Sequence, residues 1–465
     1  MRLATRLRHG WYAALVATAL AGVAGAECGG GCGGLSGTPA DEFVAERMGM
    51  VREWVAQIPF DSARADLEHV VVGDGLVVAQ TGDGGVHAFA AAPFATAAAP
   101  RPGAAALGSL LWSRTLGVAG GPTTVAGIGP RLVTVARDLD LFAVDRETGA
   151  TRWQRPLGRL PGGGAVEIGD WVYAPLSDGI RRLTFDPLQP TAKEAAPVAP
   201  QKRKAGSKKG APAASSARPT AESLRPRTFD SAGSVDRPVR PLGKGVAWTT
   251  TGGVLVTLQP TDADWERFEF ALNSAAVATP ITRGNAVFAA TVAADLARVD
   301  FVASGTRGLR TGWHIVLDAV PDAGPFLGGD TLVVSLGDSG MAAFSAETGA
   351  PLWRSPVAGR VLAVAGDRIW IIDRTARLAG LDLATGERRE RLCLGGFSFP
   401  VVNTESDRLI LASPDGLLAA LAPRRPAPPP APQPPAPQPP APQPAAPQPE
   451  EPPAAEADTE AGTET

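Results

Sequence analysis

Hydrophobic and polar residues alternate along most of the chain from Leu67 onward, and turn residues interrupt the alternation about every eight to twelve positions. A period of two predicts β-strands joined by tight turns. In the first unit, residues 70–79 read as two strands around a Gly-Asp-Gly turn, and residues 86–89 and 110–116 as two more. The Ala- and Pro-rich residues 91–107 are expected to form a loop between the third and fourth strands.

This four-strand unit recurs with a spacing of about 40 residues. Further units lie at residues 120–160, from 163 onward, 240–272, 273–318, 319–359, 360–396 and 399–421. We therefore predict an all-β protein, a β-propeller of seven or eight four-stranded blades. Eight blades are favoured, and seven would result if units four and five are wrongly divided. Because the last unit has three strands, we expect residues 61–68 to supply the fourth and close the ring, which protects the sheet edges.

Residues 38–57 show a different pattern, with apolar residues three or four positions apart. This spacing predicts a short N-terminal helix. Thr38-Pro39 would open the helix and Pro59 would end it. We expect the helix to cap or brace the propeller.

A motif recurs within the predicted units. Residues 141–153 read Leu-Phe-Ala-Val-Asp-Arg-Glu-Thr-Gly-Ala-Thr-Arg-Trp, residues 341–353 repeat this strand, turn and tryptophan, and residues 378–390 form a looser copy. The turn contains Thr-Gly each time, and its glycine stands where a tight turn needs a positive φ. The recurrence indicates a repeat architecture.

The motif resembles the pyrroloquinoline-quinone-like β-propeller repeat, and the resemblance covers about residues 67–423. The matching residues are Trp112, Asp145, Thr148, Gly149, Trp153, Thr348, Gly349, Trp353, Asp382, Thr385 and Gly386. The resemblance implies that the tryptophans pack between blades and that the Thr-Gly turns join outer strands. Ser345 replaces the aspartate of unit six, Glu390 replaces the tryptophan of unit seven, and units four and five match only in strand alternation. These residues are therefore expected to be structural, with no catalytic, cofactor-binding or metal-binding residue among them.

Two functional classes carry such repeats. Quinoprotein dehydrogenases hold the quinone and Ca²⁺ at the propeller axis and typically place a vicinal cysteine disulfide against the quinone. This chain has no adjacent cysteines, since its three are Cys28, Cys32 and Cys393. The other class is non-catalytic and includes the exported scaffold subunit of the outer-membrane β-barrel assembly machinery. The resemblance favours such a scaffold, without cofactor, which would mediate protein–protein interactions in outer-membrane protein assembly. A quinone-dependent dehydrogenase is the alternative.

Residues 1–26 resemble a secretory signal peptide, with a basic start, an apolar stretch and small residues before Glu27. An uncleaved membrane anchor is the alternative, although the apolar stretch is short for a bilayer span. Lipidation at Cys28 is disfavoured because Glu27 precedes it. No later apolar run approaches the ~20 residues that cross a bilayer. We therefore expect an exported protein of the periplasm or cell envelope of a Gram-negative-type bacterium, with no transmembrane span in the mature chain.

Two segments depart from the repeats. Residues 187–240 carry nine lysines and arginines between positions 193 and 227 among Ala, Pro, Ser and Gly, which predicts a disordered basic insertion in the propeller domain of 67–423. Residues 424–465 form a Pro/Ala/Gln-rich tail with an acidic end, expected to be a disordered spacer or a ligand for a proline-recognising partner. Residues 27–66 would then comprise a Gly-rich leader and the short helix.

The partners expected from these features are other envelope proteins. The basic residues 193–227 could also attract an anionic surface, but they include few aromatic side chains for base stacking, which argues against nucleic acid. The net charge of −3 predicts neither a nucleic-acid partner nor a strongly acidic one. The 4 His and 2 Tyr of the chain are little material for an active site. The Asp-Gly sequences near residues 74 and 83 resemble Ca²⁺ loops, but tight turns require the same residues, and the turn interpretation is favoured.

Overall fold

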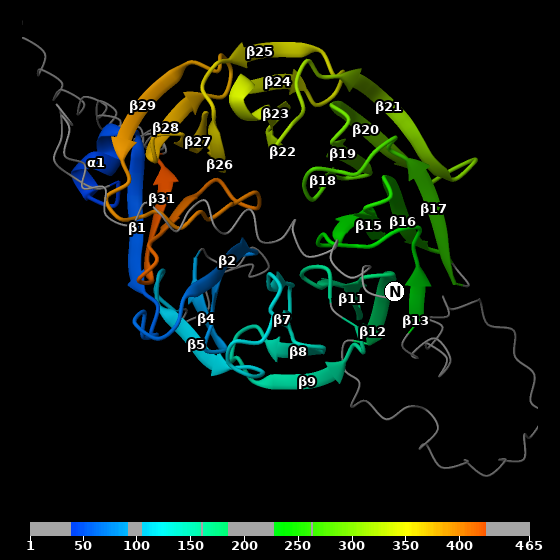
Figure 1. The fold of residues 1–465 in the computed structure, drawn as a ribbon, viewed down its shortest axis with the longest axis horizontal. Helices are drawn as coiled ribbons and strands as arrows, with labels where there is room; N and C mark the ends of the chain where they lie inside the picture. The colour runs from blue at the N-terminus through cyan, green and yellow to red at the C-terminus, as the bar shows by residue number, and fades with distance from the viewer. Residues whose placement is uncertain (1–38, 92–104, 160, 185–226, 262–263, 425–465) are drawn as a thin grey trace, which may run out of the picture. The chain divides into compact units, whose positions relative to one another are not determined.

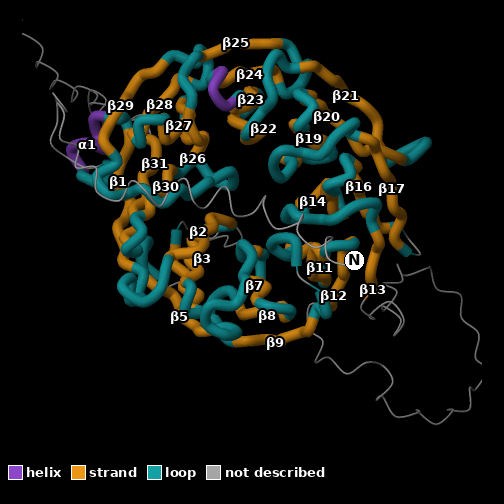
Figure 2. The backbone as a smooth tube through the Cα atoms, viewed as in Figure 1, coloured by secondary structure: helices purple, strands orange, loops and turns teal. Residues whose placement is uncertain are grey.

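The structure, a computed structural model, describes residues 39–91, 105–159, 161–184, 227–261 and 264–424. The predicted signal peptide, most of the basic insertion and the Pro-rich tail lie outside these residues. Within the described chain, eight antiparallel sheets stand side by side in a ring (Figure 1). Figure 2 shows that strands and loops make up nearly all of this ring. No helix in this part of the chain combines the length and the apolar character needed to cross a membrane.

Blades 1 to 4 follow the chain order from the innermost to the outermost strand. Their strands are β2 (Leu67–Gly73), β3 (Leu76–Thr81), β4 (Gly85–Ala90) and β5 (Leu110–Thr115); β6 (Gly127–Ile128), β7 (Leu132–Arg137), β8 (Asp140–Asp145) and β9 (Thr151–Pro156); β10 (Val166–Ile168), β11 (Trp171–Leu176), β12 (Gly179–Thr184) and β13 (Arg227–Asp230); and β14 (Arg240–Leu242), β15 (Gly245–Thr249), β16 (Val254–Pro260) and β17 (Trp265–Ala271).

Blades 5 to 7 repeat this arrangement, and blade 8 combines the two ends of the described chain. Their strands are β18 (Ile281–Arg283), β19 (Ala286–Ala290), β20 (Asp295–Val302) and β21 (Gly308–Val316); β22 (Ala323–Gly328), β23 (Thr331–Ser335), β24 (Met341–Ser345) and β25 (Pro351–Ser355); β26 (Gly359–Ala365), β27 (Arg368–Asp373), β28 (Arg377–Asp382) and β29 (Arg388–Cys393); and β30 (Leu409–Ala412), β31 (Leu417–Pro423) and β1 (Met50–Gln57). A helix, α1 (Glu42–Arg47), precedes β1, and one 3-10 turn, η1 (Gly337–Ser339), lies in blade 6.

The up-and-down order of strands gives the ring two distinct faces. The connectors between blades and the turns between second and third strands lie on one, which we call the connector face. The turns between third and fourth strands, including the Thr-Gly turns, lie on the other, which we call the turn face. The expected division into eight units is confirmed, because β14–β17 and β18–β21 form separate sheets.

The hydrophobic core is divided among the seams between blades. Eight apolar clusters are found among the described residues, and each draws on two consecutive blades. Blades 1 and 2, for example, share the cluster that contains Val78, Ala88, Val133 and Val144. Middle strands are therefore buried on both faces, as in β3 and β7, where every side chain is buried. A single blade has no core of its own.

The ring closes through β1, which pairs antiparallel with β31 from Met50–Pro423 to Gln57–Leu417. Residues 38–57 are thus helical only over α1, and the closing strand is not residues 61–68, so the propeller begins before Leu67. Gly49, with φ of 70°, ends the helical stretch. The sequence pattern misled because Val51 and Val55 are exposed, while Met50 and Trp54 are buried between blades.

The basic insertion is also shorter than expected. Residues 227–230 form β13, which pairs with β12 as the outer strand of blade 3. Val235 and Val239 are buried in the seam between blades 3 and 4. The propeller therefore resumes at Arg227, before residue 240, because this stretch has apolar residues that the seam can bury.

Candidate interaction surface

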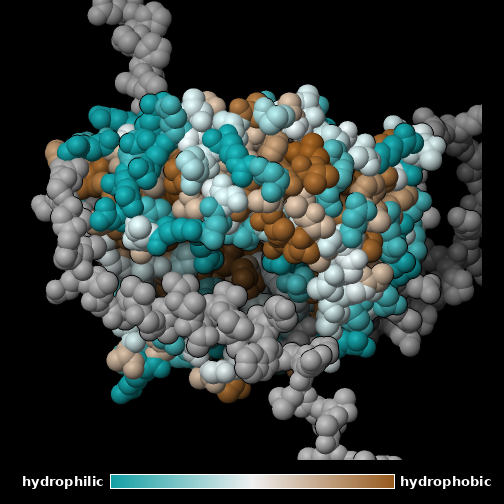
Figure 3. Space-filling view, turned by 45° about the horizontal axis from the view of Figure 1, so that its top comes forward, coloured by the Kyte–Doolittle hydropathy of each residue, from teal (hydrophilic) through white to brown (hydrophobic). Residues whose placement is uncertain are grey.

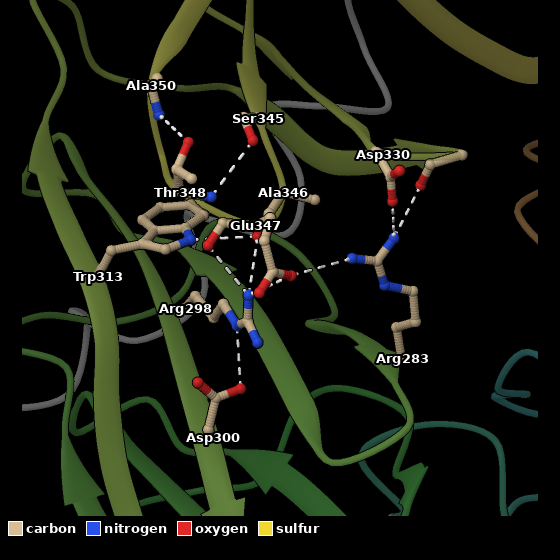
Figure 4. A network of polar contacts seen from close by, with 11 residues as sticks. Arg283, Arg298, Asp300, Trp313, Asp330, Ser345, Ala346, Glu347, Thr348 and Ala350 are labelled. Carbon is tan, nitrogen blue, oxygen red and sulfur yellow. Dashed lines mark hydrogen bonds and ion pairs between the residues drawn. The ribbon is translucent and has the colours of Figure 1, made fainter.

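The Thr-Gly turns are fixed by the residue that precedes them by three positions. In blade 2, one carboxylate oxygen of Asp145 accepts hydrogen bonds from the backbone N–H and the hydroxyl of Thr148, both at 2.9 Å. Burial would raise the pKa of Asp145, but hydrogen bonds from Arg152 and Thr148 outweigh burial and lower it. In blade 6 the hydroxyl of Ser345 accepts the N–H of Thr348 at 3.2 Å (Figure 4). Serine thus keeps the turn with a neutral side chain.

The motif tryptophans contact the turn of the next blade. Trp112 of blade 1 donates its Nε1–H to the carbonyl oxygen of Arg146 in blade 2 at 2.8 Å. Its ring also covers Gly149, where an added β-carbon would come within 2.6 Å of the ring. Trp353 of blade 6 likewise donates to the carbonyl oxygen of Leu383 in blade 7 at 2.9 Å. Each such tryptophan therefore joins two blades by an apolar contact and a hydrogen bond.

Three further tryptophans occupy the corresponding place on an outer strand. Trp153 was predicted from the repeat motif and is buried between blades 2 and 3. The other two, Trp313 and Trp54, were not predicted from the sequence. Trp313 donates to the carbonyl oxygen of Ala346 at 3.1 Å, and Trp54 of β1 packs against Gly108 in blade 1. The sequence contains a signal for Trp313 and Trp54, because an aliphatic residue follows each of the five tryptophans by four positions. The pairs are Trp54 and Ile58, Trp112 and Leu116, Trp153 and Leu157, Trp313 and Leu317, and Trp353 and Val357.

The seam between blades 5 and 6 adds a charged network (Figure 4). Arg298 of β20 donates to the carboxylate of Glu347 at 2.8 Å and to its carbonyl oxygen at 3.1 Å, while Asp300 accepts its Nε–H at 3.0 Å. Arg283 of β18 lies 2.8 Å from a carboxylate oxygen of Asp330 and 4.0 Å from one of Glu347. Burial would lower the pKa of Arg298, but Asp300 and Glu347 raise it. This network also fixes the turn of blade 6.

Blade 7 keeps the turn but not the tryptophan. Asp382 accepts the N–H of Thr385 at 3.0 Å. Glu390 replaces tryptophan and pairs with Arg368, which donates to the carbonyl oxygen of Met48 at 2.7 Å. In blade 8 the outer strand β1 and the third strand β31 come from opposite ends of the described chain and are not joined by a hairpin, so there is no Thr-Gly turn for a tryptophan to cover. A polar contact replaces the apolar one for that reason.

The histidines and acidic turns do not gather into one site. In blade 1, His87 lies 2.9 Å from the hydroxyl of Ser113. In blade 5, His314 lies 2.9 Å from Asp295. Asp83 accepts hydrogen bonds from the hydroxyl of Thr81 and the N–H of Gly85 within its own turn, as the turn interpretation requires. No group of three His, Cys, Asp or Glu side chains in the described ranges is placed to hold a metal ion.

The centre of the ring is crossed by a turn of blade 8, residues 403–408, which we call the axial turn. Its Glu405 lies 2.7 Å from Arg240 of β14, and blades 8 and 4 stand on opposite sides of the ring (Figure 1). A quinone held at the axis would need the space that this turn and its ion pair occupy. Among the described residues, the axial turn and its ion pair therefore leave no room for a quinone and Ca²⁺ at this level of the axis.

A groove of about 590 Å³ lies on the connector face over blades 4 to 6, and we call it the connector groove. Its lining comes from three blade connectors and two turns: Asp236, Arg237, Thr249, Thr250, Thr251, Ala275, Ala276, Val277, Val292, Pro321 and Asp322. The hydroxyl of Thr249 is buried and, within the described part of the chain, has no hydrogen-bond partner. The groove therefore combines an apolar floor with an unsatisfied polar group.

Exposed valines lie on the connector face near blade 5, and one of them, Val292, lines the groove. Val292, Val316 and Val320 are 51%, 73% and 56% exposed, and they lie at the same end of blade 5 or in the connector that follows it. Figure 3 shows apolar areas that interrupt the polar surface on the side it presents, next to a hollow. Exposed apolar side chains grouped on one surface are typical of a site that binds another protein.

Comparison with known proteins places the fold. The profile of a family described as outer membrane protein assembly factor BamB matches residues 61–185 and 304–425, together more than half of the chain. No curated protein matches the sequence. The crystal structure of BamB from Moraxella catarrhalis is similar over 80% of this chain and 97% of its own, with 17% identity and a TM-score of 0.55. A computationally designed protein, Ika8, is similar over 80% of this chain and 99% of its own, with 12% identity and a TM-score of 0.52.

Proposed function

Because the chain belongs to the family described as outer membrane protein assembly factor BamB, we propose that it is a non-catalytic propeller scaffold of the periplasm or cell envelope. It binds proteins that take part in outer-membrane protein assembly and holds them on the connector face. The connector groove is the observation that carries this proposal.

The groove supports protein binding through its chemistry. Ala275, Ala276, Val277 and Pro321 give it an apolar floor, and burying apolar surface contributes about 25 cal/mol per Å². Part of the groove, from Asp236 to Val292, lies outside the residues that the family profile matches. The profile thus leaves out blade 4 and most of blade 5, and this chain's own sequence shapes that part of the groove.

The axis supports a non-catalytic role. The ion pair between Glu405 and Arg240 crosses the place where the resemblance to quinoproteins puts the cofactor. The seam tryptophans and Thr-Gly turns fix the blades, and none of them lines the connector groove. The repeat residues therefore support the scaffold without taking part in binding.

The proposal is tested by affinity capture with two matched variants. The purified chain is immobilised and exposed to a Gram-negative envelope extract, and outer-membrane assembly proteins are quantified by mass spectrometry. The first variant places aspartate at both Val292 and Val320, beside the groove. The second, Val118→Asp, changes a 70% exposed valine of the connector between blades 1 and 2, on the same face but away from the groove.

We expect the native chain and Val118→Asp to recover the same assembly proteins, and the groove variant to lose at least about nine-tenths of them, since an unpaired charge in an apolar contact costs more than the ~1–3 kcal/mol of a neutral polar group. Equal recovery by all three proteins would exclude the groove. Recovery of no assembly protein would contradict the scaffold role itself. Stoichiometric retention of pyrroloquinoline quinone after addition with Ca²⁺, followed by its absorbance, would contradict a non-catalytic role.

A further inference from the structure

The innermost position of blade 8 differs from that of the other blades. Instead of a regular strand it contains an isolated bridge between Phe399 and Ala412, followed by the axial turn. Figure 1 shows this segment, in orange, extending from beside β31 into the middle of the ring. The closing blade therefore projects toward the opposite side of the ring.

Asn403 holds the axial turn in shape. Its side-chain oxygen accepts the backbone N–H groups of Glu405 and Ser406 at 3.0 and 3.1 Å. Its side-chain nitrogen donates to the hydroxyl of Ser406 at 2.8 Å and to the carbonyl oxygen of Arg408 at 2.6 Å. Asn403 is 1% exposed. Four hydrogen-bonding groups of the turn therefore depend on one buried amide, which presents Glu405 in a fixed position.

The axial turn is anchored to three other parts of the ring. The backbone N–H of Asn403 donates to the carbonyl oxygen of Leu362 in blade 7 at 2.7 Å. Glu405 pairs with Arg240 of blade 4 at 2.7 Å. Arg408, at the end of the turn, donates to both carboxylate oxygens of Glu53 in β1, at 2.5 and 2.9 Å.

The third anchor concerns the closing strand itself. β1 comes from the other end of the sequence and is held to the last blade by pairing with β31. A bidentate pair between an arginine and a carboxylate is among the stronger polar contacts, because two parallel hydrogen bonds fix the geometry. Both partners are mostly buried, with 15% of the Arg408 side chain and 20% of the Glu53 side chain exposed.

We propose that the axial turn is an internal brace for ring closure, which ties the closing strand β1 to blades 7 and 4 from inside the ring. Pairing with β31 holds β1 along its length, and the brace fixes blade 8 against the blades beside and opposite it. Because every seam depends on its neighbours, opening at blade 8 exposes the apolar cores on both of its sides, and the brace suppresses that opening.

Amide hydrogen exchange on the full chain tests the brace, since exchange of β1 and β31 reports how often the closure opens. We expect Asn403→Ala to raise exchange of residues 50–57 and 417–423 about tenfold, because it removes the bonds that shape the turn. Asn285→Ala, in an exposed turn of blade 5, is the control and should change nothing at the closure.

The ion pair gives a second test that leaves the turn intact. Glu405→Gln and Arg240→Gln should each raise closure exchange about two- to fivefold, as expected for a partly exposed pair. Exchanging the two charges, with Arg240→Glu and Glu405→Arg together, should restore most of the protection. Arg227→Gln removes the exposed pair with Asp264, which has the same 2.7 Å separation, and should leave the closure unaffected.

If Asn403→Ala does not fold, the ion-pair variants decide the matter. Faster exchange confined to residues 403–408, with β1 and β31 unchanged in Glu405→Gln and Arg240→Gln, would overturn the brace and leave a purely local turn. Binding of assembly proteins is measured separately, so failure of the proposed function would not be mistaken for failure of the brace.

Discussion

Gly149 serves two purposes at one position. Its φ of 66° lies in the left-handed region, and the space where a β-carbon would stand is taken by the ring of Trp112. Gly349 and Gly386 have the same conformation and are covered in the same way by Trp313 and Trp353. The sequence motif is thus the local half of a contact whose other half lies in the preceding blade.

A substitution at Gly149 separates these two requirements. Gly158 has φ of 72° with nothing within 4 Å of an added β-carbon, so Gly158→Ala should cost about 1 kcal/mol through backbone strain alone. Gly149→Ala should cost a further 1–3 kcal/mol or so, because the ring of Trp112 must move. Chemical denaturation of both variants measures the difference, and equal losses would show that the ring contact contributes nothing.

His87 makes stability depend on pH. Burial lowers its pKa below the ordinary 6.5, although Asp83 opposes the shift, and burial lowers the pKa of His69 as well. The unfolded chain therefore takes up protons first, so the free energy of unfolding should fall as pH drops through about 6.5, until the folded histidines are protonated.

Urea denaturation between about pH 8 and pH 5 would show this fall. His87→Gln can still contact Ser113 and should make the fall shallower, and adding His69→Gln should flatten it further. An unchanged slope in both variants would mean that other groups cause the dependence.

At the scale of elements, β1 completes the last sheet and brings Trp54 and Ile58 into the seam between blades 8 and 1. A chain that starts at residue 62 lacks this strand and leaves the edge of β31 open, which favours aggregation. We expect it to associate and to unfold at a lower temperature than a chain that starts at residue 39.

Size-exclusion chromatography and thermal unfolding measure both effects, and adding a peptide of residues 39–61 should partly reverse them. A monomeric truncated chain with the same unfolding temperature would show that closure does not need β1.

Element type was predictable where the period was unambiguous. Units four and five were correctly divided from alternation alone, and their strands β14–β21 form separate sheets. The helix prediction was wrong for residues 50–57. An apolar spacing of three to four also fits a strand in which Met50 and Trp54 are buried and the valines are exposed. Only pairing with β31, more than 350 positions away in the sequence, decides between helix and strand there.

At the scale of the whole molecule, stability and binding depend on contacts that no unit contains. Each apolar cluster spans two blades, so the ring is stable only as a closed set. The connector groove is built from residues between 236 and 322, on connectors that the ring brings together. Composition offered no sign of it, because its lining consists of ordinary alanine, valine, threonine and proline.

The sequence by itself determined most of the strands, the eight units and the turn motif, because alternation, glycine conformation and turn chemistry act over a few neighbouring residues. It also contained the signal for Trp54 and Trp313 in the aliphatic residue that follows four positions later. The tertiary structure alone decided that β1 closes the ring, that Glu405 reaches Arg240 across it, and that a groove forms over blades 4 to 6. These contacts join residues far apart in the chain, and only closure of the ring brings them within bonding distance.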